Sequence, residues 1–395
     1  MNRWLIFSRY MRRRSDIEVE LGVFLQLIPI NIPLIGEEEK SEVMKVLESG
    51  LLTTASPEGG EYVRKFQSAV ESFLNVKHAL AVNSGTSALY AALLALNIKA
   101  GDEVLVPSFT FLATANAVLL TGAEPVFVDV ELNHYTVDPE YLEKKITSRS
   151  RAVIPVHLYG HPAYMDKISE VAEKHDLHII EDAAQSLGAT YKGHQTGTLS
   201  DIGCFSLYPS KVITCGEGGF VTTDDDALAE RLKMVRNHGL VHGYDSTILG
   251  SNLRMPQMEA AVASVQMSKL PSFLKARRKN ADILTEMLSG LSGVTLPSED
   301  EGCSSNWYLY TVTLAKNRDK VLEYLVSHEV GASVYYSPPV HRVPLYVKKG
   351  FGELSLPNTD WASHHVLSLP IHPGVSEDDL EFIASTFKDA LASVG

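Results

Sequence analysis

A lysine, a strand-end acid and a turn of small residues follow one another along the chain in an order that suits one kind of chemistry. Ser84 and Gly85 open a small-residue turn after an apolar strand, and Asp182 ends the apolar run 179–182. Lys211 follows another apolar run and precedes a glycine-rich stretch. A phosphate-sized turn, a carboxylate and an amine are the groups that hold pyridoxal 5'-phosphate and use it as an electron sink. The order predicts a pyridoxal-phosphate enzyme.

The turn at residues 84–87 could hold the phosphate. Gly85 allows close backbone approach, and Thr86 and Ser87 add hydroxyl groups to the amides of a helix N-terminus, which favours anions. Each feature alone has a plainer explanation, because small polar residues before a helix are often N-caps and most lysines are solvated. Together with Asp182 and Lys211, the turn favours a cofactor site.

The composition is that of an ordinary globular protein and excludes some partners. The chain has 395 residues, of which 45% are hydrophobic and 21% charged, enough for two or three domains. A net charge of -13 argues against nucleic acid or an anionic membrane surface as the main partner. The cysteines Cys204, Cys215 and Cys303 are widely spaced, so we expect neither a disulfide framework nor a metal site, and a reducing cytoplasm.

Residues 1–29 look like an N-terminal extension. Arginines precede an apolar run at residues 21–28, which partly resembles a signal peptide. Asp16, Glu18 and Glu20 separate the two parts, no small-residue cleavage site follows, and the run is too short to span a bilayer. We expect a loose tail, or a start codon placed too far upstream.

From residue 79 onward, apolar strands alternate with amphipathic helices. This pattern predicts an α/β fold with a mostly parallel central sheet flanked by helices. Expected strands are 79–82, 103–107, 125–130, 152–156, 179–182, 203–207 and 219–223, and expected helices are 37–47, 86–96, 110–120, one from 165, and 226–237. Long helices are expected over 255–288 with a break at Pro271, and strands at 307–312 and 332–336. We therefore predict a large domain over 30–265 and a smaller α+β domain over 266–395.

Several motifs together resemble one known family. They are NIPLIG at 31–36, VNSGTSAL at 82–89, PSFTF at 107–111, PVHLYGHP at 155–162, IEDAAQ at 180–185 and CFSLYPSK at 204–211. In this order they are similar to the DegT/DnrJ/EryC1/StrS family, the fold-type-I, pyridoxal-phosphate-dependent nucleotide-sugar aminotransferases, including perosamine-synthase-like members. The resemblance extends from about residue 31 to the C-terminus.

The resemblance implies a role for individual residues. Lys211 matches the lysine that binds the cofactor covalently, and Asp182 matches the acid that pairs with the pyridine nitrogen. Asn252 matches a residue that reaches the phosphate in the neighbouring subunit, which implies a homodimer with shared active sites. The other implied cofactor contacts are Thr86, Ser87 and Ser206 at the phosphate, Gln185 beside the ring, and Phe111 stacked on it.

The implied substrates are glutamate and a nucleotide-linked keto-deoxysugar, with a 4-keto sugar favoured over a 3-keto sugar. Residues 336–346 resemble a stretch that lies near the sugar nucleotide, so Tyr336 and His341 are candidate substrate contacts, as is Arg254. Ser337 and Val340 depart from the usual stretch, and Tyr308 stands where a histidine often occurs. These departures bear on which sugar is aminated.

Two other functions compete with this interpretation. One is the sugar 3-dehydratase branch of the same family, which carries histidine where this chain has Lys211. The other is a non-catalytic regulator that binds the cofactor or a sugar nucleotide. A regulator has no need of a proton-moving lysine beside an acid, so Lys211 and Asp182 together argue for an enzyme. His157 and His161, near a strand end, are expected to be structural.

Overall fold

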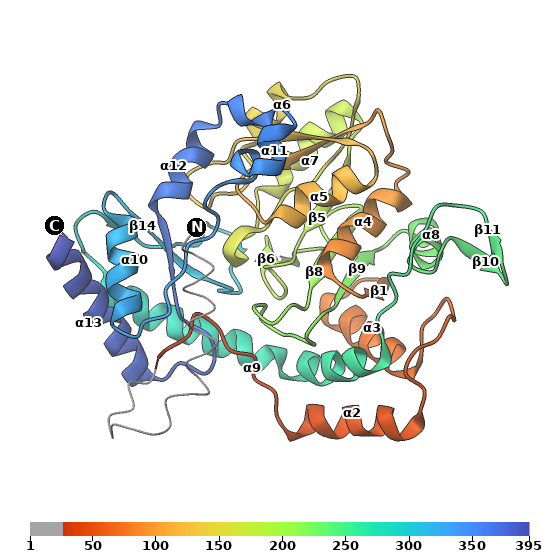
Figure 1. Ribbon diagram of the computed structural model, residues 1–395, viewed down its shortest axis with the longest axis horizontal. Helices are drawn as coiled ribbons and strands as arrows, with labels where there is room; N and C mark the ends of the chain where they lie inside the picture. Colours follow the sequence, from red (N-terminus) through yellow and green to blue (C-terminus); the bar gives the residue numbers. More distant parts are fainter. Residues whose placement is uncertain (1–26, 395) are drawn as a thin grey trace.

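The structure is a computed structural model that describes residues 27–394 (Figure 1). Residues 1–26 of the predicted N-terminal extension lie outside the described residues. Just after them, Ile28 is buried and forms a parallel bridge with Val330 near the C-terminal core. Within the described part of the chain, every helix is too short or too polar to cross a membrane.

The centre of the molecule is a seven-stranded sheet with the strand order β1-β9-β8-β5-β4-β2-β3. β9 alone runs against the direction of the other six strands, so the predicted mostly parallel sheet is confirmed. The strands are β1 (His78–Val82), β2 (Glu103–Pro107), β3 (Glu124–Val128), β4 (Ser150–Val153), β5 (His178–Asp182), β8 (Ile202–Ser206) and β9 (Gly219–Thr223).

Helices cover both faces of this sheet, because successive strand residues point to opposite sides. In β1, Leu80 and Val82 join one buried cluster, whereas Ala79 and Ala81 join another. The first cluster contains α4 (Gly85–Ala95), α5 (Leu112–Leu120) and α8 (Asp226–Arg236). The second contains α3 (Glu61–Leu74) and the first half of α9 (Gln257–Leu288), with α2 (Glu37–Ser49) packed against α9. A further cluster on β2 to β5 is covered by α6 (Pro139–Lys144) and α7 (Met165–His175).

The strand register brings two segments together: the turn at residues 84–87, called the phosphate turn below, and the loop between β8 and β9 that carries Lys211, called the lysine loop. Gly219 of β9 pairs with Val82 at the end of β1 and also with Ser206 at the end of β8. Asp182, the last residue of β5, pairs with Cys204 of β8. Because parallel strands end at the same edge of a sheet, the residues that follow these three strands lie side by side.

The predicted break at Pro271 is wrong, since α9 continues through this residue. A proline inside a helix removes one hydrogen bond and costs about 3 kcal/mol. Here the helix is buried on both sides of the proline, by Met267 and Leu270 in one core and by Ala281 and Leu284 in another, and this packing outweighs the loss. The helix thus runs across the predicted domain boundary at 265/266.

The C-terminal part contains a second, three-stranded antiparallel sheet with its own core. Its strands are β12 (Val294–Thr295), β14 (Tyr310–Leu314) and β15 (Val366–Leu369), and its helices are α10 (Arg318–Ser327) and α13 (Glu377–Val394). The predicted strand at 332–336 is wrong, because only Ser333 forms a bridge, to Ser368. Tyr335 and Tyr336 instead pack against the core of the large sheet.

Residues 340–356 also return to the large sheet, where Val340, Tyr346 and Leu356 are buried among residues of α4 and α5. The remaining short elements are η1 (Leu158–Gly160), β6 (Thr190–Tyr191), β7 (His194–Gln195), β10 (Leu240–His242), β11 (Asp245–Ser246), β13 (Cys303–Ser304), η2 (Val340–Arg342), α11 (Pro344–Lys348), η3 (Phe351–Glu353) and α12 (Pro357–His365). The hairpin β10–β11 projects from the body of the molecule at the right of the view (Figure 1).

Candidate active site

Asp182 ends β5 as a buried carboxylate. Its Oδ2 accepts a hydrogen bond of 2.8 Å from the Thr114 hydroxyl, and its Oδ1 accepts one of 3.3 Å from the amide of Ala184. Burial raises the pKa of Asp182, while these hydrogen bonds and the positive charge of Lys211 act in the opposite direction. The hydrogen bonds therefore orient the carboxylate but offset only part of the cost of burying its negative charge. A cation bound next to it would stabilise that charge further.

Lys211 lies in the loop between β8 and β9, close to Asp182. Its amide donates to the carbonyl of Tyr208 at 2.8 Å, which closes a turn. Its side-chain nitrogen lies 4.8 Å from the centre of the Tyr308 ring, and Ser210 Oγ lies 3.2 Å from the Tyr308 hydroxyl. Tyr308 therefore contacts the lysine loop at two points.

The loop is held from outside by residues of three segments. The Asn31 side chain donates to the carbonyl of Pro209 at 3.0 Å and accepts from Arg277 of α9 at 2.7 Å. Arg277, which is buried, also donates to the carbonyls of Trp307 and Tyr308. One guanidinium thus ties the lysine loop to the segment that carries Tyr308.

The predicted phosphate turn, residues 84–87, leads from β1 into α4. Ser84 caps α4 by accepting a hydrogen bond from the amide of Ser87 at 3.1 Å, and its hydroxyl lies 2.9 Å from that of Ser87. A Cβ atom on Gly85 would lie 2.7 Å from Cβ of Ser206, so only glycine allows this approach. Gly85, Thr86, Ser87 and Ser206 are thus gathered at the N-terminus of α4, and all four are half-buried.

Phe111, Tyr336 and Gln185 form the aromatic side of the site. Phe111 precedes α5 with 57% of its surface exposed, and its ring centre lies 6.2 Å from that of Tyr336. Gln185 donates to the Tyr336 hydroxyl at 3.1 Å and accepts from the amide of Tyr159 at 2.9 Å. The exposed Phe111 ring leaves a face free for stacking, whereas both ends of the Gln185 amide are already bonded.

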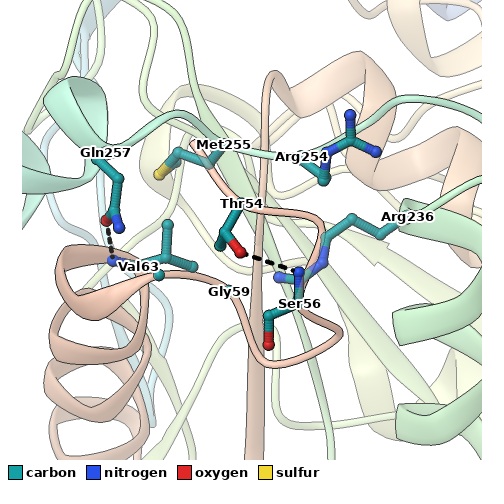
Figure 2. A pocket seen from close by; sticks show the side chains of 9 residues that line it. Thr54, Ser56, Gly59, Val63, Arg236, Arg254, Met255 and Gln257 are labelled. Carbon is teal, nitrogen blue, oxygen red and sulfur yellow. Dashed lines mark hydrogen bonds between the residues drawn. The ribbon is translucent and has the colours of Figure 1, made fainter. Parts of the chain in front are cut away.

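Two predicted contacts, Asn252 and Arg254, lie beside the end of β1, where Arg254 forms an antiparallel bridge with Val82. Asn252 is exposed, and its carbonyl accepts from Asn83 at 3.3 Å. Arg254 donates to the side chain of Asn237 at 2.7 Å. Arg254 lines a pocket (Figure 2) together with Thr54, Ser56, Gly59, Gly60, Val63, Arg236, Met255 and Gln257. Asp182 and Lys211 are not among the residues that line this pocket.

His341 is fully buried rather than open to a ligand. Its Nδ1 lies 2.7 Å from the hydroxyl of Ser108, and its Nε2 lies 3.4 Å from Oδ1 of Asp360. Burial lowers the pKa of His341. In this arrangement the imidazole fastens residues 340–342 to the end of β2. His157 is equally buried, and its Nε2 lies 2.9 Å from Glu181, in agreement with the structural placement expected for it.

Sequence reasoning missed three residues that shape this site: Thr114, Tyr159 and Arg277. Thr114 stands in an apolar helix like any small helical residue, and Arg277 stands in a long charged helix. Tyr159 has a positive φ of 57°, and its hydroxyl donates to the carbonyl of Tyr335. A signal was available only for Tyr159, inside the PVHLYGHP motif.

The described residues fit pyridoxal phosphate. A glycine-lined helix N-terminus suits the phosphate, the exposed face of Phe111 suits an aromatic ring, and Asp182 suits a ring cation. Lys211 lies close enough to Asp182 for its charge to affect the pKa of that carboxyl group. The four features lie at one edge of the sheet.

Comparisons with known proteins agree with this geometry. The dTDP-3-amino-3,4,6-trideoxy-alpha-D-glucose transaminase of Streptomyces venezuelae is 41% identical over 85% of this chain and 87% of its own length. The GDP-perosamine synthase of Caulobacter vibrioides is 34% identical over 93% of this chain and 99% of its own. The crystal structure of S. venezuelae DesV has a TM-score of 0.86 at 38% identity, and the match covers 92% of this chain and 98% of DesV.

The match to DesV, together with a match to the aminotransferase PseC of Helicobacter pylori, confirms the predicted fold-type-I transferase fold. The model of the DegT/DnrJ/EryC1/StrS aminotransferase family matches residues 33–388, which is nearly all of the described chain. With relatives up to 41% identical over most of its length, this protein belongs to the DegT/DnrJ/EryC1/StrS aminotransferase family.

Proposed function

We propose that this protein transfers the amino group of glutamate to the ketone of a nucleotide-linked deoxysugar, with pyridoxal 5'-phosphate held between Asp182 and Lys211. The observation that carries the proposal is the pairing of a buried, hydrogen-bonded Asp182 with Lys211 beside a glycine-lined helix N-terminus. The named relatives, which include a dTDP-sugar transaminase, support a sugar nucleotide as the acceptor.

When bound, pyridoxal phosphate supplies an electron sink and a carrier for the amino group. Asp182 would hold a proton on the ring nitrogen, because an ionised carboxylate favours a neighbouring cation. Thr114 and the amide of Ala184 keep that carboxylate oriented. The side-chain nitrogen of Lys211 would anchor the resting cofactor and, once freed, move a proton to and from carbon.

The substrate side of the site is proposed to involve Tyr336, Arg254 and the segment around His341. Tyr336 is half-buried beside Phe111, so its ring can border a sugar bound over the cofactor. The position of the ketone, predicted at C4, stays a prediction. One relative, from Acidithiobacillus ferrooxidans, is named a UDP-N-acetyl-3-dehydro-alpha-D-glucosamine 3-aminotransferase and is 38% identical over 84% of this chain and 89% of its own length, so a 3-keto sugar is the competing substrate.

We also propose that the active unit is a homodimer with shared sites. Asn252 is exposed, although its carbonyl bonds Asn83 next to the phosphate turn. Large apolar side chains are also exposed, at Leu51, Leu52 and Leu249. Exposed apolar side chains are a feature of subunit contacts. We likewise propose a reducing cytoplasm as the location of the protein, because its three cysteines, Cys204, Cys215 and Cys303, are widely spaced in the sequence.

The test is to trap the lysine chemically. Borohydride reduction of the holoenzyme should fix the cofactor on the peptide that contains Lys211, and Lys211→Ala should stay folded without turnover. Lys279→Ala, an exposed lysine paired with Glu377, is the matched control and should keep full activity. Recovery of the label on a different lysine would overturn the assignment.

A second measurement identifies the substrate and separates an enzyme from a regulator. Isotope-labelled glutamate is supplied with dTDP-, GDP- and UDP-linked 3-keto and 4-keto sugars, and the labelled amino sugar is detected by mass spectrometry. Glutamate alone should change the visible absorbance of the bound cofactor. An absorbance that glutamate leaves unchanged would favour a regulator that binds the cofactor passively.

A further inference from the structure

Two histidines and one aspartate form a cluster outside the residues assigned to the reaction. His134 follows β3, His161 follows η1, and Asp300 precedes β13, so the three are far apart in the sequence. One possible ligand atom from each lies within 4.8 Å of the other two. From the sequence, whose three cysteines are widely spaced, no metal site is expected.

His161 presents an unpaired nitrogen to this cluster. Its Nδ1 lies 2.8 Å from the carbonyl oxygen of Pro162, an acceptor, so Nδ1 carries the proton and Nε2 carries the lone pair. Nε2 is buried and has no hydrogen-bond partner among the described residues. A buried acceptor without a partner is destabilising unless something binds it.

His134 and Asp300 supply the neighbouring donors. The rings of His134 and His161 are stacked, with centres 3.6 Å apart and planes 2° from parallel. Nε2 of His134 lies 3.1 Å from Oδ2 of Asp300, but the two are not aligned for a hydrogen bond. The hydroxyl of Tyr164 donates to the same carboxylate oxygen at 2.8 Å and fixes its direction.

Two of the three ligands, His134 and Asp300, stand on segments with their own internal support. The Glu131 carboxylate accepts the amides of His134 and Thr136, which holds the first loop. The carbonyl of Asp300 accepts the amide of Cys303 at 2.9 Å, which closes a turn before β13. The side chain of Asp300 is 39% exposed, so an ion and a water molecule can reach the cluster from that side.

We propose that His134, His161 and Asp300 bind a divalent transition-metal ion of the zinc type. Two imidazoles and a carboxylate suit zinc, and water would be the fourth ligand. With metal–ligand bonds of about 2.0–2.1 Å, tetrahedral ligand atoms lie about 3.3 Å apart. The ligand atoms lie within 4.8 Å of one another, so they need to approach by up to about 1.5 Å. Rotation about the side-chain torsions has to bring this about, and it also has to turn the two stacked rings out of parallel, because each nitrogen lone pair lies in the plane of its ring.

The metal would fasten two segments that frame Lys211. The turn that precedes His161 carries Tyr159, whose amide bonds Gln185, and the segment after Asp300 carries Tyr308 beneath Lys211. These segments already meet, because a Cβ atom on Gly160 would lie 2.1 Å from the side chain of Asn306. The ion is therefore a positioning element and has no contact with the reacting atoms.

The test measures zinc retained by the holoenzyme after removal of any affinity tag. The protein is loaded with zinc chloride, passed through gel filtration with a weak chelator, and analysed by mass spectrometry of the elements. Wild type should retain about one zinc ion per chain. His161→Gln and His134→Gln should bind zinc at least about tenfold more weakly, and Tyr164→Phe should show a smaller loss.

His175→Gln is the matched control, because His175 pairs with Glu143 at 3.1 Å without a second histidine. It should retain zinc like wild type. Circular dichroism and retained cofactor confirm that each variant is folded. Zinc should also raise the Tm of wild type but not that of His161→Gln. The proposal is overturned if wild type retains no zinc, or if His161→Gln retains as much zinc as wild type.

Discussion

The side-chain nitrogen of Lys211 lies 4.8 Å from the centre of the Tyr308 ring, within the range of a cation–π contact. Tyr308 also bonds Ser210 through its hydroxyl, so it supports the lysine through the ring and the lysine loop through the oxygen. In the family pattern that this segment resembles, a histidine often stands at the position of Tyr308. The tyrosine therefore gives Lys211 an aromatic face in place of a titrating ring.

Replacement of Tyr308 should separate the two contacts. Tyr308→Leu removes the ring and should lower kcat about two- to thirtyfold, which corresponds to about 0.5–2 kcal/mol for a cation–π contact. Tyr308→Phe keeps the ring and should lose less. Steady-state kinetics with glutamate would show a fall in kcat with little change in KM. Equal losses in the two variants would mean that the hydroxyl alone supports Lys211.

Asp182→Asn should abolish most activity without removing the cofactor. The amide keeps the shape of the side chain but cannot stabilise a proton on the ring nitrogen, and loss of such a charge contact costs about 3–4 kcal/mol, a hundred- to thousandfold in rate. Turnover and cofactor absorbance are measured on the same preparation. A variant with nearly unchanged turnover would show that another group holds the ring proton.

Thr114→Val tests how far the orientation of that carboxylate matters. The substitution keeps the shape of the side chain and removes the 2.8 Å hydrogen bond to Asp182. A hydrogen bond to a charged group contributes about 1.5–3 kcal/mol, so kcat should fall about ten- to hundredfold. Thr121→Val, whose hydroxyl bonds the backbone of Val118 and Ala123 and no group of the site, is the control in the same helix region and should keep full activity. If both variants are fully active, Asp182 does not depend on Thr114.

The sequence predicts the parts of this site that depend on local signals. Asp182 ends an apolar strand, and Ser84 caps a helix, so their place at the sheet edge follows from the strand pattern. Thr114 could not be assigned in this way, because its contact with Asp182 joins residues that are 68 positions apart. Arg277 could not be assigned either, because a charged residue in a long helix usually faces solvent.

The two wrong element predictions have a common cause. Local propensity predicts a break at Pro271 and a strand at 332–336, but tertiary packing decides both. Buried residues on either side keep α9 continuous at Pro271. Tyr335 and Tyr336 leave the small sheet because they pack beside the large one. Such contacts between distant segments leave no periodic trace in the sequence.

His372 should make the protein less stable in acid. The ring is buried, Nδ1 accepts the amide of Gly374 and Nε2 donates to the carbonyl of Pro29, so the fold requires the neutral form. Burial lowers the pKa of His372 from 6.5 to about 4. The unfolded chain therefore takes up a proton below about pH 6.5 while the folded chain does not, and stability falls from there to about pH 4, by about 3 kcal/mol.

Urea unfolding across this pH window checks the prediction. Residue 372 cannot titrate in His372→Gln. Between pH 6.5 and 4 the free energy of unfolding of this variant should therefore fall by about 3 kcal/mol less than that of wild type. His194→Gln, an exposed histidine on β7, is the control and should keep the wild-type slope. An unchanged slope in His372→Gln would show that His372 is not the group that takes up the proton.

The sharing of sites between subunits can be tested through Asn252. Its side chain is exposed, yet its carbonyl accepts from Asn83, the neighbour of Ser84 in the same chain. Asn252 could therefore complete the phosphate site of a partner subunit or stay beside that of its own chain. Lys211→Ala and Asn252→Ala chains, each severely impaired alone, distinguish these cases when they are mixed and refolded.

If Asn252 serves the partner subunit, a heterodimer of the two variants contains one site with both lesions and one site with neither. Half of the chains would be in such heterodimers, so the mixture should regain up to about a quarter of wild-type activity. If each chain builds its own site, every site in the heterodimer carries one lesion and no activity returns. Native mass spectrometry confirms that heterodimers formed, so absent activity in their presence would exclude shared sites.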